Sequence, residues 1–123
     1  MIETDWKILY VDSIYGDLET YDPRLDRKHF EIWNEWHILI TFTIGDDRGG
    51  CQYILWVCSK EYAYKHAPMF GRYLLIVDDW DMEDIIYRVN LIIDDCVKRA
   101  TTDEQVVNNL SKYMFWEFDN YQP

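Results

Sequence analysis

Apolar and polar positions alternate along much of the first half of the chain, which is typical of β-strands. One alternation covers residues 6–13, where both faces are fairly apolar, and a longer one covers residues 31–44. The glycine-rich segment 45–50 follows as a turn and residues 51–58 return as a strand, so the pattern predicts a β-hairpin. Residues 73–79, rich in Leu, Ile and Val, predict a further strand.

Apolar residues that recur three and four positions apart predict two helices in the last third of the chain. The first helix begins at Asp81, with acidic residues at its positive amino end and an apolar stripe that continues to Val97. Thr102 with Gln105 forms a capping box that begins the second helix. Its predicted buried stripe consists of Val106, Val107, Leu110, Tyr113 and Met114.

The remaining segments complete a single predicted domain over residues 1–123. Residues 60–66 predict a short helix, and residues 115–118 a closing strand or packed segment. Residues 17–28 are polar and contain a proline, so they predict the longest loop. Most strands precede the long helices, which favours an α+β fold: an antiparallel sheet of about four strands with two C-terminal helices packed on one face.

Charge narrows the classes of partner. The chain has 23 Asp and Glu residues against 12 Lys and Arg residues, a formal net charge of −11, while 49% of its residues are hydrophobic. That composition places the charge on a folded domain, where its simplest role is solubility. A surface of this sign repels a polyanion, so we expect no direct contact with nucleic acid. It favours a basic protein partner, such as a nuclease, whose association it would accelerate.

Neither a membrane span nor a secretory signal is predicted. Apolar runs such as residues 53–57 and 73–77 are far shorter than the ~20 residues that a bilayer requires. The first residues lack a basic segment followed by an apolar one. We therefore expect a cytoplasmic protein that does not contact a membrane.

Residue types that carry catalysis are present without a recognisable arrangement. The three cysteines show no two-residue spacing, the three histidines are scattered, and the acidic run 78–84 lacks the spacing of a calcium-binding loop. We predict no metal, no cofactor and no enzymatic activity. Two alternatives stay open: a small enzyme that uses a pair of carboxylates, with or without a divalent cation, and an acidic mimic of nucleic acid.

Five short segments carry a family resemblance: Val57-Cys58-Ser59, Leu75-Ile76-Val77 leading into Trp80-Asp81, Ile85 with Cys96, Leu110-Ser111-Lys112-Tyr113, and Trp116-Glu117-Phe118 with Tyr121. With them, the chain resembles the immunity protein 8 family of bacterial polymorphic-toxin and contact-dependent inhibition systems over about residues 38–121. The resemblance implies a stoichiometric antidote, made in the cytoplasm beside a toxin gene, that binds the toxin domain and blocks it. It implies no particular contact residues, because the shared positions are mostly apolar.

The leading hypothesis is therefore an immunity protein that neutralises a cognate toxin domain, of the basic nuclease type, through an acidic surface that contains aromatic residues. The oligomeric state is not predicted. The acidic candidates for partner binding are first Asp78, Asp79, Glu83 and Asp84, and second the loop residues Asp17, Glu19 and Asp22. Aromatic residues are enriched among interface hot spots. The aromatic candidates are Trp33, Trp36, Tyr62 and Tyr64.

Overall fold

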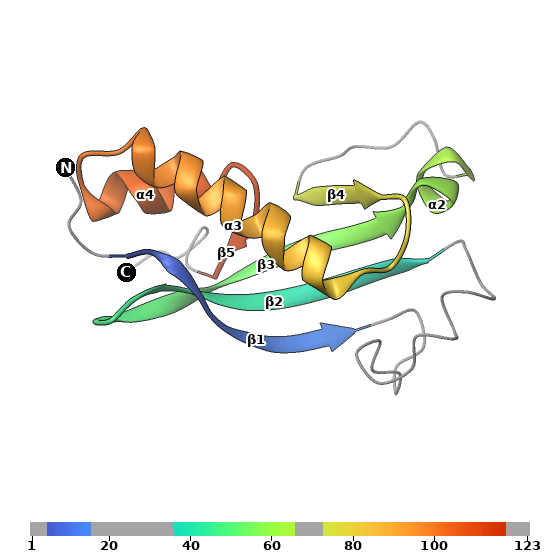
Figure 1. Cartoon of the computed structure of the whole chain (residues 1–123), viewed down its shortest axis with the longest axis horizontal. Coiled ribbons are helices and arrows are strands. Elements are labelled where there is room, and N and C mark those ends of the chain that lie inside the picture. The colour runs from blue at the N-terminus through green and yellow to red at the C-terminus, as the bar shows by residue number, and fades with distance from the viewer. Residues whose placement is uncertain (1–4, 16–35, 66–72, 118–123) are drawn as a thin grey trace.

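The structure is a computed structural model that describes residues 5–15, 36–65 and 73–117. Its elements follow the order β1 (Lys7–Tyr15), β2 (His37–Asp46), β3 (Gly49–Ser59), α2 (Lys60–Lys65), β4 (Leu74–Val77), α3 (Met82–Lys98), α4 (Asp103–Leu110) and β5 (Phe115–Trp116). Figure 1 shows α3 lying across one face of the sheet, with α4 beyond its carboxyl end. This arrangement confirms the predicted α+β class and the two C-terminal helices.

The sheet is mixed, with strand order β1-β2-β3-β4 and mostly antiparallel pairing. One half of β3 pairs with β4 in parallel, from Trp56↔Leu74 to Ser59↔Val77. The other half pairs with the short β5 in antiparallel, through Tyr53↔Trp116 and Ile54↔Phe115. The parallel pair arises because the connection through α2 crosses over, whereas a simple meander would have made it antiparallel.

The predicted hairpin is present, with a turn that is tighter than expected. β2 and β3 pair without a break from His37↔Cys58 to Asp46↔Gly49. Only Asp47 and Arg48 therefore lie outside the ladder, so most of the glycine-rich segment 45–50 belongs to the two strands. Gly49 has a φ of +126°, a conformation that residues with a Cβ rarely adopt.

One face of the sheet forms the core with the helices. The buried side chains alternate along the two hairpin strands, as Ile38, Ile40, Phe42 and Ile44 on β2 and Tyr53, Leu55 and Val57 on β3. They belong to one cluster with the buried α3 residues, which are Ile85, Val89, Ile93 and Cys96. This cluster explains why the 3.6-residue periodicity of α3 was readable in the sequence.

The first strand departs from simple alternation. Its ladder with β2 shifts register between Ile8 and Tyr10 and again between Val11 and Ser13. A bulge of this kind inserts one extra residue and reverses the side of the sheet on which the next side chains lie. The β1 residues that pack on the core are consequently Ile8, Val11 and Ile14, three positions apart.

The second helix begins as the capping box predicts, with one change of partner. The Thr102 hydroxyl accepts a hydrogen bond from the Gln105 backbone N–H at 3.2 Å. The Gln105 side chain reaches back to Thr101, accepting from its backbone N–H at 2.7 Å and from its hydroxyl at 2.9 Å. α4 ends at Leu110, so Tyr113 lies in the following turn and is 39% exposed; its predicted place in the buried stripe was wrong.

We expect Thr102→Ala to destabilise the protein by about 1 kcal/mol, because one N–H group of the first turn loses its acceptor. Urea unfolding followed by circular dichroism measures the change. Thr41→Ala, on the face of the sheet away from the helices, is the control. Equal midpoints for wild type and Thr102→Ala would show that the cap does not stabilise α4.

Candidate interaction surfaces

An acidic patch, defined here as Asp78, Asp79, Asp81, Glu83 and Asp84, surrounds the start of α3. β4 ends at Val77, whose side chain is buried. Three residues later, the side chain of Trp80 is buried as well. Trp80 is 6% exposed, and its ring meets that of Trp36 edge-to-face at 5.5 Å. Because Val77 and Trp80 turn inward, the aspartates between and after them face solvent.

The helix start fixes the geometry of the patch. The Asp81 carboxylate caps α3 by accepting a hydrogen bond from the Asp84 backbone N–H at 3.2 Å. Asp84 in turn binds the Arg88 guanidinium at 2.9 Å, one helical turn along. Asp78 is 82% exposed and lies 3.5 Å from the Lys60 ammonium group. Asp79, Asp81 and Glu83 form no ion pair with another residue that the structure describes.

The structure brings most of the leading acidic candidates together. Asp78, Asp79 and Asp84 line one depression of about 270 Å³, together with Asp81 and Arg88. Glu83 lies exposed on the first turn of α3. The second group of candidates, Asp17, Glu19 and Asp22, lies outside the described residues.

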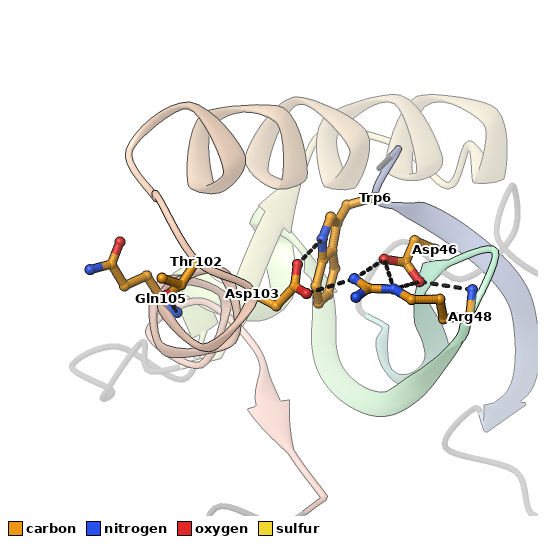
Figure 2. Close-up of polar contacts among 6 residues, drawn as sticks. All are labelled: Trp6, Asp46, Arg48, Thr102, Asp103 and Gln105. Atoms are coloured by element: carbon orange, nitrogen blue, oxygen red, sulfur yellow. Dashed lines mark hydrogen bonds and ion pairs between the residues drawn. The ribbon is translucent and has the colours of Figure 1, made fainter. Parts of the chain in front are cut away.

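A second polar cluster lies at the opposite end of the sheet (Figure 2). Arg48, in the hairpin turn, binds Asp46 of β2 and Asp103 of α4, with shortest separations of 2.5 and 2.6 Å. The Trp6 indole N–H also donates to Asp103, at 3.3 Å. Hydrogen bonds to the two carboxylates raise the pKa of Arg48, so its guanidinium stays charged. The cluster joins three segments far apart in sequence, and the Asp46-x-Arg48 spacing in the turn was its only sequence signal.

A cavity of about 440 Å³ adjoins this cluster, and Trp6, Cys51, Tyr53 and Val107 are among its lining residues. Tyr53 is fully buried, and its hydroxyl has no hydrogen-bond partner among the residues that the structure describes. Burial raises the pKa of the Tyr53 hydroxyl above its ordinary value, because the phenolate form would lose its hydration.

The described residues offer neither an activated cysteine nor a cluster of metal ligands. Burial raises the pKa of the Cys58 thiol, which keeps it protonated at neutral pH and makes it a poor nucleophile. Over the described ranges, no group of three or more His, Cys, Asp or Glu side chains is placed to hold a metal ion. Within the same ranges, no helix has the length and apolar character of a membrane span.

The aromatic candidates divide by exposure. Trp36 is only 2% exposed and meets Trp80 edge-to-face, so it belongs to the core and not to an exposed surface. Tyr64 is 86% exposed, and Tyr62 stacks on His37 with ring centroids 5.0 Å apart. Trp33 lies outside the described residues.

Two exposed residues on α3, Tyr87 and Leu91, were missed by the sequence reasoning. Tyr87 is 60% exposed and Leu91 49% exposed. Their position relative to the buried stripe of the same helix was the available signal, because residues four apart share one face. A helical projection would have placed both on the side opposite the core.

Comparison with known proteins identifies one family. The model of the family described as Immunity protein 8 matches residues 6–121, nearly the whole chain. No curated protein and no solved structure matches the chain.

Proposed function

We propose that this chain, which belongs to the immunity protein 8 family, neutralises a cognate bacterial toxin domain by covering it with the acidic patch. The family implies an immunity protein that binds a toxin protein. Our proposal adds the character of the partner, a basic domain of the nuclease type, and the compartment, the cytoplasm. The mechanism requires binding without a chemical step.

The observation that carries the proposal is the concentration of negative charge beside α3. Asp79 and Asp81, which form no ion pair with another described residue, line a depression, and a nuclease presents lysines and arginines where its substrate's phosphates bind. Opposite charges on two such surfaces raise the rate of productive encounter. Individual exposed ion pairs stabilise by only about 0 to 1 kcal/mol, so the charges must act together and with apolar contacts.

We expect cells that express the toxin domain encoded directly upstream to survive when this chain is co-expressed, and purified samples of the two to form a one-to-one complex. Growth curves, and size-exclusion chromatography with light scattering, measure these outcomes. An unrelated toxin domain serves as the specificity control. Continued growth arrest together with separate elution of the two proteins would refute the proposed function.

A further inference from the structure

We propose that the toxin domain docks on the outward face of α3, with Tyr87 and Leu91 as its apolar anchors; this inference rests on the proposed function. The two residues lie one helical turn apart and are 60% and 49% exposed. In Figure 1, α3 crosses in front of the strands, and no described element lies over its outer side. The anchors therefore form an apolar surface that the described part of the chain leaves uncovered.

The position of the two anchors follows from the helical repeat. Ile85, Val89 and Ile93 are each fully buried against the sheet and define the inward side of α3. At 100° per residue, Tyr87 and Leu91 each lie about 160° from the mean direction of that stripe, on either side of its opposite pole. Large side chains on this outward side contribute nothing to the core, so their loss should leave folding nearly unchanged.

Unpaired acids border the anchors. Glu83 lies one turn before Tyr87, and Asp94 lies three residues after Leu91. Neither forms an ion pair with another described residue. The other acids of the helix differ, because Asp84 is paired with Arg88 and Asp95 with Arg99, both at 2.9 Å. The outward face thus presents apolar surface with one unpaired carboxylate on each side of the anchors, and its amino end adjoins the acidic patch.

Charge complementarity selects a basic protein as the occupant. A second copy of this chain would bring Glu83 and Asp94 against the same acidic surface, and its net charge of −11 would oppose association. A basic partner can place a lysine or arginine over the Tyr87 ring and near the flanking carboxylates, which adds a cation–π contact to the ion pairs. Aromatic anchors inside a charged rim are the usual composition of an interface hot spot.

The double variant Tyr87→Ala/Leu91→Ala tests the docking surface, with an inactivated form of the toxin domain encoded upstream as the probe. We expect the Kd to rise by about 30-fold, mostly through faster dissociation, because both anchors lose their contact area. Surface plasmon resonance gives the rates, and the urea midpoint should stay within error of wild type. Tyr10→Ala is the control for the loss of an exposed tyrosine, since Tyr10 is 66% exposed and lies on β1, away from α3.

The outcomes separate the two proposals. Wild-type affinity in Tyr87→Ala/Leu91→Ala, with a normal wild-type complex, overturns the docking surface and leaves the proposed function intact. Failure of the wild-type chain to bind the toxin domain overturns both. A loss of affinity that is equal in the control variant also overturns the docking surface, because it would show that any exposed tyrosine matters.

Discussion

Replacing Gly45 by alanine is expected to destabilise the protein by more than about 3 kcal/mol. A Cβ at this position would collide with the Gly49 carbonyl oxygen and lie 2.5 Å from the Gly50 Cα. Both obstacles are backbone atoms of the paired strand, so no side chain can rotate away. The hairpin would have to separate at the point where β2 and β3 carry the sheet's longest ladder. Urea unfolding followed by tryptophan fluorescence measures the loss.

Gly49→Ala is the matched control for this clash. No atom lies within 4 Å of a Cβ built there, so the cost comes only from the φ of +126° and should be about 1–3 kcal/mol. The two substitutions therefore separate steric exclusion from backbone strain within one turn. A larger loss of stability for Gly49→Ala than for Gly45→Ala would show that strand separation at Gly45 is easily accommodated.

The elements that the sequence predicted well are those set by local chemistry. The capping residues Asp81 and Thr102 accept the hydrogen bonds that their positions suggest, and the hairpin forms where glycines permit a tight turn. These features depend on neighbours within about five residues. The bulges in β1 do not depend on such near neighbours. Their register shifts are decided by how Ile8, Val11 and Ile14 pack against the core.

Long-range pairing explains the remaining differences in the fold. The sequence of residues 73–79 predicts a strand, but it does not indicate whether that strand pairs in parallel or antiparallel with its neighbour. β5 consists of two residues, too few for a periodic pattern. It pairs with the part of β3 that precedes the residues paired with β4. The sequence pattern thus reports which segments are extended, and packing decides how they pair.

The candidate site was predictable in charge and not in shape. A run of acids at a helix start is visible in the sequence, whereas the depression that Asp78, Asp79 and Asp84 line is seen only in the structure. Residue type alone did not reveal exposure: Trp36 and Tyr87 are both large aromatic residues, yet Trp36 packs on Trp80 in the core and Tyr87 faces solvent, which only the helical periodicity of α3 indicates. Composition alone cannot separate anchors for the core from anchors for a partner.

The double charge reversal Asp78→Lys/Asp79→Lys is expected to slow association with the toxin domain by about 100-fold at low salt. It changes the net charge from −11 to −7, since each substitution removes one negative charge and adds one positive charge. Folding should be nearly unaffected, because Asp81 and not these residues caps α3. Among the described residues only the exposed Lys60–Asp78 ion pair is lost, and such pairs contribute little to stability. Stopped-flow fluorescence at several ionic strengths measures the association rate.

Asp5→Lys/Asp47→Lys makes the same change of net charge elsewhere and is therefore the control. Asp47 lies in the turn between β2 and β3, at the end of the sheet away from the start of α3 (Figure 1). If steering comes from the acidic patch, this control loses much less of the association rate and keeps most of its salt dependence, whereas the rate for Asp78→Lys/Asp79→Lys hardly varies with salt. Equal losses in both variants would mean that net charge alone attracts the toxin, so the patch would have no special role.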